Sequence, residues 1–280
     1  MSSSRSSKRD HGTTLASRPS RLARWGTKRA GLVSAVSLIA LAVPASALAA
    51  QPPVGLGTAD SFALLAGSTA TNTGPSVING DLGVSPGSAD TGFTGAPNGT
   101  VNGAVHTGDS VAAGAQSALT NAITDAAGRN PRAAITADLG GQTLTPGVYN
   151  GPTLGLTGAL TLDAQGDPNA VFIFQAGSTL ITAVGSSVNL VNGAQACNVF
   201  WEIGSSATLG AASVFTGNIL ASTSISMNNA VTVLGRALAS TGGVTLINDT
   251  ITAARCATGG TGGGGGTGTP TTGGTPTTGG

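Results

Sequence analysis

The sequence has little charge, and most of its positive charge lies at one end. Only 8% of the 280 residues are charged. Eight of the twelve basic residues precede residue 51, whereas ten of the eleven acidic residues follow it. Without the first fifty residues the formal net charge is −6, and no lysine remains. Nucleic-acid binding needs clustered basic side chains that displace counterions, so we expect no nucleic-acid partner.

Side chains suited to catalysis or metal binding are also scarce. His106 is the one histidine after residue 50, and without a cysteine pair nearby it predicts no metal site. Asp163 and Asp167 are the closest carboxylates, but they lie in a Gly/Pro turn, where aspartate commonly caps backbone groups. A polysaccharide-active enzyme would need these acids gathered in one groove with Arg236, which stands alone in its repeat. We predict no enzyme activity and no cofactor.

Only two cysteines are present, Cys197 and Cys256. An exported chain permits them to pair, and a bridge closing about sixty residues would contribute about 4 kcal/mol to stability. If the coils described below stack in sequence order, the two residues lie roughly 14 Å apart, too far for a disulfide. Pairing therefore requires the chain after Thr252 to fold back.

The N-terminal segment has the features of an export signal. Its basic region is followed by the apolar run AGLVSAVSLIALAV and by PASALAA, in which Ala47-Leu48-Ala49 fits the small-x-small cleavage rule. We predict a secretion signal over residues 1–49 and an extracellular protein that has no membrane contact after cleavage. A retained anchor over Ala30 to Ala50 is the alternative, because that stretch is nearly long enough to span a bilayer.

The C-terminal end is also unlike the middle of the chain. Residues 257–280 form a Gly/Thr/Pro tract that cannot bury apolar surface, so we predict a disordered tail. One domain remains, over residues 50–256, and we expect it to be a monomer. The tail could also serve as a spacer that keeps the domain near the cell surface.

What the domain has in quantity is short alternations of apolar and hydroxyl residues separated by glycine. Thr208-Leu209, Ser226-Met227 and Thr245-Leu246 recur 18 and then 19 residues apart, and Thr179-Leu180 precedes them. A period near twenty is typical of a β-solenoid, in which each coil buries its inner side chains against the next coil. The alternation predicts that the leucines and the methionine point inward and that the hydroxyls point to water.

Other strands are apolar throughout, which indicates cover on both faces. They are AVFIF, NVFW, GNILA and GRALA. The residues between Asp109 and Pro131 predict the covering helix, with Asp109 as its N-cap and Gly128 near its end. Its apolar stripe consists of Val111, Ala115, Ala118, Leu119, Ala122 and Ala126. We expect this helix to lie along the apolar side of the solenoid.

Several blocks of sequence resemble one known family. They include LGTADSFALLAGST, VINGDLGVSPG, LTPGVYN, NVFWEIGSSATLG and GRALAST, and they span about Leu56 to Thr252. In this order they resemble the microbial ice-binding family. The resemblance implies a mostly β fold, a right-handed triangular β-solenoid with one long α-helix packed along one side. It also implies that N-terminal strands complete the solenoid and that the partner is ice or ordered water.

Two exposed faces compete as the site. The first carries the column Thr179, Thr208, Ser226 and Thr245, to which Thr69, Thr71 and Thr73 could add. The second passes through AASV, NAVT and NDTI, with Ala211, Asn229 and Asn248 at its start and Val214, Thr232 and Ile251 at its end. The resemblance implies Thr-(Ala or Gly)-x-(Thr or Asn) repeats on this second face. Its candidate residues are Thr182, Asn229, Thr232, Asn248 and Thr250.

These observations predict a secreted, non-catalytic protein that adsorbs to ice through a flat face bearing Thr, Ser and Asn. Stacked coils space equivalent hydroxyls about 4.8 Å apart, and such an array can hold ordered water. The alternative is a cell-surface structural or adhesion module without ice activity, with a cell-wall glycan or a protein as its partner. Outward hydroxyl columns also occur on solenoids that bind nothing in particular, so composition alone leaves both readings open.

Overall fold

The structure is a computed structural model that describes residues 51–257. The predicted signal segment, the alternative anchor and nearly all of the predicted tail lie outside these residues. One long helix, α1 (Ser110–Gly128), accompanies many short strands, which confirms a mostly β fold with one helix. No helix within residues 51–257 is both long and apolar enough to cross a bilayer.

The elements before α1 form the N-terminal part of the solenoid. They are η1 (Gly57–Ala59), β1 (Phe62–Ala66), β2 (Thr69–Thr73), β3 (Val77–Asn79), β4 (Asp81–Val84), β5 (Ala89–Thr91), β6 (Thr100–Val101) and β7 (Val105–Thr107). The elements that follow α1 form the rest. They are β8 (Arg132–Ala134), β9 (Thr143–Leu144), β10 (Gly147–Gly151), β11 (Leu154–Leu156), β12 (Ala159–Asp163), β13 (Phe172–Ala176), β14 (Leu180–Thr182), β15 (Ser187–Val191), η2 (Ala196–Asn198), β16 (Val199–Ile203), β17 (Ala207–Leu209), β18 (Val214–Ala221), β19 (Ile225–Met227), β20 (Thr232–Ala239), β21 (Val244–Ile247) and β22 (Thr250–Thr252).

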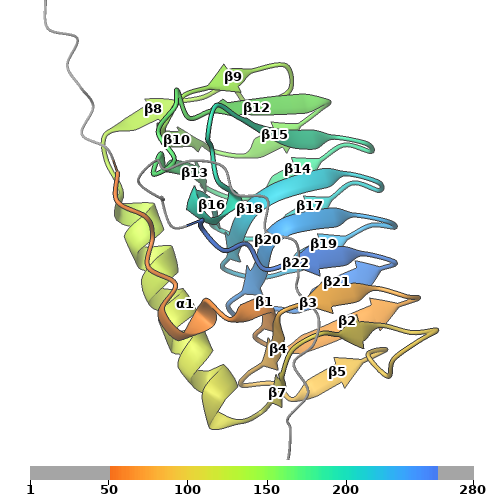
Figure 1. Ribbon diagram of the computed structural model, residues 1–280. Coiled ribbons are helices and arrows are strands. Elements are labelled where there is room, and N and C mark those ends of the chain that lie inside the picture. The colour runs from red at the N-terminus through yellow and green to blue at the C-terminus, as the bar shows by residue number, and fades with distance from the viewer. Residues whose placement is uncertain (1–50, 258–280) are drawn as a thin grey trace, which may run out of the picture. The chain divides into compact units, whose positions relative to one another are not determined.

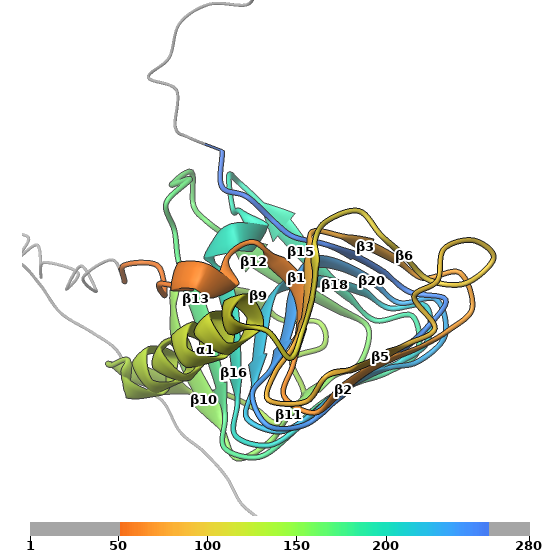
Figure 2. The same ribbon diagram turned by 90° about the horizontal axis from the view of Figure 1, so that it is seen from below.

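The strands stack in parallel, coil upon coil, into two sheets (Figure 1). The seven-stranded sheet has the order β11-β14-β17-β19-β21-β2-β5, and we call its outer surface the seven-stranded face. The other sheet has fifteen strands and covers two sides, because β18 and β20 bend in the middle. We call its side under α1 the helix side, and the side formed by β12, β15, β22, β3 and the first halves of β18 and β20 the third face (Figure 2).

Two stacked glycines make this bend. Gly217 and Gly235 pair across β18 and β20 and have φ values of 117° and 150°, which residues with a Cβ rarely adopt. A Cβ on Gly235 would also lie 1.9 Å from the carbonyl oxygen of Gly217. Glycine at both positions therefore lets one strand serve two sides of the solenoid.

The order of the coils departs from the order of the sequence. Strand β1 lies between β20 and β4, β2 pairs with β21, and β3 pairs with β22. The N-terminal strands thus extend the stack beyond its last C-terminal coil, and α1 returns the chain along the side to the other end (Figure 1). This confirms that N-terminal strands complete the solenoid, and that Thr69 to Thr73 form one of them.

Helix α1 covers the helix side as its sequence predicts. The Asp109 carboxylate accepts a hydrogen bond of 2.8 Å from the Ala112 N–H and caps the helix. The buried stripe consists of Ala112, Ala115, Leu119, Ala122 and Ala126. From Ala115 onward it packs with apolar residues such as Phe62, Phe200 and Leu238. Val111 was wrongly predicted to belong to this stripe. It lies one position off the stripe, which runs through Ala112, and it is 49% exposed.

Aromatic rings fill the interior of the solenoid. Tyr149, Phe174, Trp201 and Phe215 form a continuous row with ring centroids 5.6, 4.0 and 4.9 Å apart. The Trp201 indole N–H donates to the Thr216 carbonyl at 3.0 Å, so the one polar atom of this ring is satisfied. Close packing of this kind resists bending of the coils that it joins.

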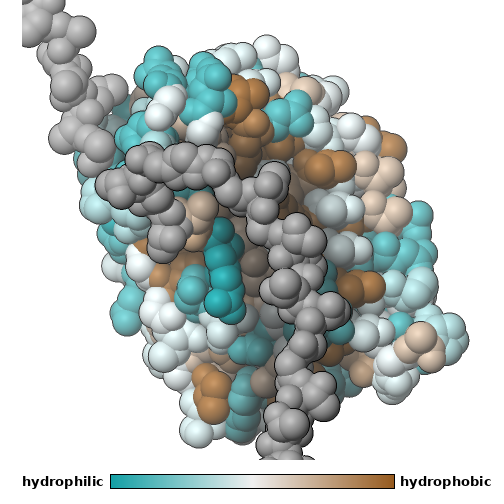
Figure 3. Space-filling model, in the orientation of Figure 1, coloured by the Kyte–Doolittle hydropathy of each residue, from teal (hydrophilic) through white to brown (hydrophobic). Residues whose placement is uncertain are grey.

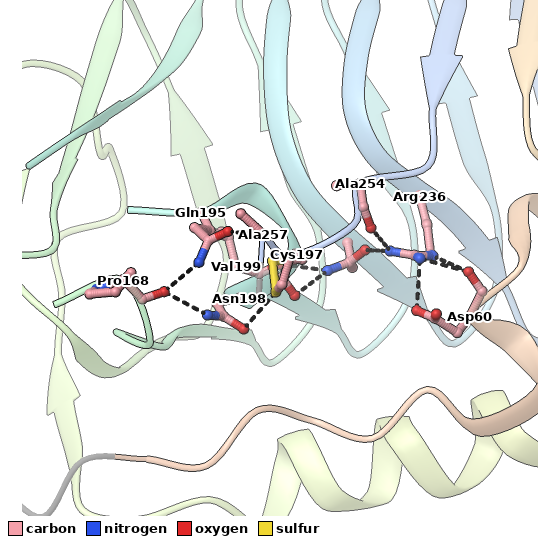
Figure 4. Close-up of a disulfide and its surroundings, with 11 residues drawn as sticks. Asp60, Pro168, Gln195, Cys197, Asn198, Val199, Arg236, Ala254 and Ala257 are labelled. Carbon is pink, nitrogen blue, oxygen red and sulfur yellow. Dashed lines mark hydrogen bonds and ion pairs between the residues drawn. A yellow bond between two sulfur atoms is a disulfide. The ribbon is translucent and has the colours of Figure 1, made fainter. Parts of the chain in front are cut away.

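The C-terminal chain folds back over the solenoid and is fastened at its end. Cys256 forms a disulfide with Cys197, with 5.4 Å between the Cα atoms (Figure 4). The Ala257 N–H then donates to the Gln195 side chain at 2.7 Å. The 14 Å separation expected from stacking does not apply, because the chain leaves the stack after Thr252.

A buried arginine holds the same segment. Arg236, 2% exposed, donates to the Asp60 carboxylate at 2.7 Å, to the Asn218 side chain at 2.8 Å and to the Ala254 carbonyl at 2.9 Å (Figure 4). One guanidinium therefore joins the N-terminal segment, a central coil and the folded-back C-terminal chain.

Candidate functional site

The seven-stranded face presents a row of aligned hydroxyl side chains. We call this row the hydroxyl column; its members in strand order are Thr208, Ser226, Thr245, Thr71 and Thr91. Each member lies opposite the next on a neighbouring strand, and each is exposed or half-buried. Since neighbouring strands lie about 4.8 Å apart, the column extends over about 19 Å.

A buried row lies directly beneath this column. Leu209, Met227 and Leu246 follow the hydroxyl residues on their strands and are at most 1% exposed, as the alternation predicts. Because a close-packed interior holds the inward residues, it also holds the backbone that carries the outward ones. The hydroxyl column is therefore part of a rigid surface, and the exposed Thr69 and Thr73 of β2 flank it.

The seven-stranded face carries almost no charge. Asp90, on the terminal strand β5, is the one charged residue in the seven strands of this sheet as the structure defines them. Charged groups hold their hydration water strongly and resist giving it up. Because charged groups are scarce, the water next to this face mainly contacts hydroxyl and methyl groups.

The hydroxyl column ends at Thr208, although the sequence predicts that it continues to Thr179. Thr179 was predicted to align with Thr208, but it precedes β14 and is half-buried. The residue opposite Thr208 is Ile181, which is 56% exposed. The repeated Thr-Leu dipeptide misled the prediction, because Leu180 pairs with Ala207 and the register is shifted by two residues.

Thr182 was also predicted to lie on the surface, and this is wrong. It is only 4% exposed, and its hydroxyl accepts a hydrogen bond of 2.9 Å from the Gly210 N–H. Its strand begins at Leu180, so the inward positions are Leu180 and Thr182, with Ile181 outward between them. Thr182 thus holds the backbone of the next coil and is not exposed on either face.

Asn229 and Asn248 lie at the corner between the seven-stranded face and the third face. Both are exposed, and the Asn248 side chain donates to that of Asn229 at 2.6 Å. Ala212, Ala230 and Asn248 have positive φ values of 55°, 65° and 55°, which turn the chain at this corner. Neither asparagine belongs to a strand of either face.

On the third face, Thr232 lies opposite both Val214 and Thr250. Ile251, predicted to end this row, is fully buried. The reason is a shorter corner: five positions separate Thr245 from Thr250, whereas six separate Ser226 from Thr232. Asp249 closes the shorter corner, where its carboxylate accepts hydrogen bonds of 2.7 Å from two backbone N–H groups.

The third face is chemically mixed. Val191, Val214 and Leu234 are 37%, 52% and 45% exposed, and Thr216, whose position would make it part of a second hydroxyl row, is buried. Figure 3, drawn from the side of β12, β15 and β18, shows hydrophobic residues interspersed among hydrophilic ones. This surface therefore lacks the continuous hydroxyl array of the seven-stranded face.

Asp163, Asp167 and Arg236, the residues considered for catalysis, each form hydrogen bonds or an ion pair with neighbouring groups of the chain. The Asp163 carboxylate accepts hydrogen bonds of 2.8 Å from the Gln165 N–H and the Asn192 side chain, and these bonds lower its pKa. Asp167 caps the Asn169 N–H at 2.8 Å, and Arg236 is paired with Asp60. Within residues 51–257 no group of three or more His, Cys, Asp or Glu side chains is arranged to hold a metal ion.

The burial of two carboxyl groups, those of Glu202 and Asp249, was not predicted from the sequence. Burial raises the pKa of Glu202 to about 7 and that of Asp249 to about 6. Glu202 lies in the otherwise apolar strand VFWEI and is 8% exposed. A lone acid within a continuous apolar strand was the available signal.

Comparison with known proteins gives a consistent result. A family model described as ice-binding-like matches residues 64–252. An ice-binding protein of Nostoc sp. (strain HG1) is 54% identical over 202 residues, which cover 71% of this chain and 74% of the relative. An ice-binding protein of Flavobacterium frigoris (strain PS1) is 37% identical over 218 residues, 71% and 76% of the two chains. The crystal structure of an ice binding protein from an Antarctic Biological Consortium superimposes with a TM-score of 0.70 at 43% identity, over 72% of this chain and 92% of the other.

Proposed function

The chain belongs to the ice-binding-like family, and we propose that it adsorbs to ice through the hydroxyl column. The observation that carries this proposal is the register of five hydroxyl residues on neighbouring strands. A single hydrogen bond between a hydroxyl and water contributes little, so adsorption to a lattice requires many such bonds in register on a rigid plane. The buried row beneath the column supplies that rigidity.

The proposed contact area is confined to one part of the seven-stranded face. It runs over β17, β19, β21, β2 and β5, where threonine and serine dominate. Towards β11 the column position is taken by Ile181 and then Gly155, neither of which offers a hydroxyl. We assign Asn229 and Asn248 to the rim of the contact area, and Thr232 and Thr250 to the neighbouring third face.

The proposal also includes the handedness and cross-section of the coils and the export of the protein from the cell. We infer that the coils wind right-handed with a triangular cross-section; right-handed connections between parallel strands are the rule. We further propose that residues 1–49 direct export, that residues 50–256 act outside the cell as a monomer, and that no catalysis or cofactor is involved. The Cys197–Cys256 disulfide supports export, because disulfides persist mainly in oxidising compartments.

The direct test is to measure thermal hysteresis and inhibition of ice recrystallisation with the purified exported protein. We expect faceted ice crystals and a concentration-dependent hysteresis, with serum albumin at equal concentration as the inactive control. Absence of both effects at high micromolar concentration would reject adsorption to ice. The cell-surface adhesion module would then be the better description, and binding to wall polysaccharide the next measurement.

A further inference from the structure

A polar hollow of about 250 Å³ lies where the end of α1 meets the helix side. Its lining residues are Ala127, Arg132, Asn150, Gly151, Gln175, Gly177 and Glu202. Asn150, Gln175 and Glu202 come from β10, β13 and β16 and lie opposite one another in register. The hollow belongs to the fifteen-stranded sheet and shares no residue with the hydroxyl column.

Some of the polar groups in the hollow are occupied by the helix end. The Gln175 amide donates to the Ala126 carbonyl at 2.7 Å, and the Arg132 guanidinium donates to the carbonyls of Ala127 and Arg129. Ala126 and Ala127 lie in the last turn of α1, where carbonyl groups lack the N–H partner that a continuing helix would supply. These bonds leave the Gln175 carbonyl oxygen and the remaining guanidinium N–H groups available.

Glu202 has no such partner. Its side chain is almost fully buried, yet no residue between 51 and 257 forms a hydrogen bond or an ion pair with its carboxyl group. Burial raises the pKa of Glu202, and the nearby charge of Arg132 lowers it by a smaller amount. Glu202 lines the hollow, so water or a ligand within it can serve as the hydrogen-bond partner of the carboxyl group.

We propose that the hollow binds one small, uncharged, hydroxyl-rich molecule, an open-chain polyol or a single sugar ring. A free cation would meet Arg132, and an anion would meet Glu202. A metal ion would find one carboxylate among the lining side chains, too few for the oxygen-rich shell of a hard cation. A hydroxyl group, in contrast, donates to Glu202 or the Gln175 oxygen and accepts from Arg132 or Asn150.

The size and protonation of the site agree with this ligand class. The hollow is smaller than the roughly 300–1,000 Å³ of pockets that hold drug-sized ligands, so the ligand is compact. Burial raises the pKa of Glu202 to about 7, so both protonation states are populated near neutral pH. Each state can bond a hydroxyl group, because the carboxylate accepts and the protonated form also donates.

The test is a nuclear magnetic resonance titration of the full chain, labelled with nitrogen-15, with glycerol and with glucose in separate arms. We expect saturable amide shifts confined to Gly151, Gln175, Gly177 and Glu202. Saturation with glucose alone identifies a sugar-ring site, and saturation with glycerol alone identifies a polyol site. Shifts that grow linearly, or that spread evenly over the surface, would overturn the proposal.

Variants assign the binding to these side chains. Glu202→Leu and, separately, the exposed Arg132→Ala should each weaken binding about tenfold or more, the effect of losing a strong hydrogen bond. Glu202→Gln retains a hydrogen-bonding amide and should keep most of the affinity, whereas Asn189→Ala on the third face is the matched control. Unchanged affinity in both Glu202→Leu and Arg132→Ala would reject the site. Ice adsorption should be the same in all four variants, so this proposal and the proposed function fail independently.

Discussion

Thr71, from the N-terminal part of the chain, lies directly opposite Thr245, from the last repeat, on neighbouring parallel strands. The contact joins two stretches of hydroxyl residues that are far apart in the sequence into one column. The strands before α1 therefore do more than cap the solenoid, because β2 and β5 supply Thr71 and Thr91 to the proposed contact area.

A bulky side chain within the column should abolish most of the ice activity. In Ser226→Tyr or Thr245→Tyr the ring would hold the face away from the lattice, so several hydroxyl contacts of about 0.5–1.5 kcal/mol each would be lost. A loss of this size corresponds to a tenfold or greater weakening of adsorption. Thermal hysteresis against concentration measures it. Asn189→Tyr places the same ring on the exposed third face and should leave the hysteresis unchanged; equal losses in all three variants would contradict the assignment.

Lengthening the column should have the opposite effect. Ile181 occupies the next position in register with Thr208, and its side chain is 56% exposed. Ile181→Thr keeps a β-branched residue in the strand and adds one hydroxyl, so we expect higher hysteresis and a melting temperature within about 2 °C of the parent. The matched change Val214→Thr, on the third face, should not raise hysteresis. A gain only in the Val214 variant would move the contact area to that face.

The sequence was sufficient to predict the repeats, the helix and the inward row, because each follows a local period. It could not give the register across coils, since that depends on corner lengths that vary by one or two residues. Thr179 was misplaced in this way. Ile251 was placed at the end of the second face, but the corner closed by Asp249 is shorter, so Thr250 takes that position. The exact pairing of Thr71 with Thr245 depends on long-range packing. The burial of Glu202 had a local signal in its apolar strand, but the hollow beside it did not.

Glu202 predicts an unusual dependence of stability on pH. Its folded pKa of about 7 lies above its ordinary value of 4.5, so the folded state binds the proton more tightly. The stabilisation is therefore complete below the ordinary value and is lost as the pH rises through about 7, with a magnitude on the order of 1–3 kcal/mol. We expect the melting temperature to fall between pH 5 and pH 8.

The Glu202→Gln variant tests this origin, because the amide does not titrate. Its melting temperature should fall less than that of the parent over the same range. Asp249, with a pKa raised to about 6 by burial, should account for part of the remaining slope. A parent protein that gains stability from pH 5 to pH 8, or a variant with the parent's full slope, would contradict the prediction.

The ion pair between Asp60 and Arg236 should be a main determinant of stability. Arg236 is almost completely buried, whereas the Asp60 side chain is 67% exposed, so truncating the aspartate leaves a buried charge without its counter-ion. The backbone carbonyl of residue 60, the Asn218 side chain and the Ala254 carbonyl would still accept from the guanidinium, and this limits the cost of Asp60→Ala to about 1–3 kcal/mol. Asp60→Asn keeps an acceptor and should cost less.

Chemical denaturation of the two Asp60 variants measures these costs. Asp90→Ala is the control, because it removes an exposed carboxylate from the terminal strand β5. The order expected for the free energy of unfolding is parent and Asp90→Ala highest, Asp60→Asn next and Asp60→Ala lowest. If Asp60→Ala were as stable as the control, the backbone and amide partners alone would hold the Arg236 guanidinium. The ion pair would then contribute nothing to the stability of the contact between Arg236 and the segment around Asp60.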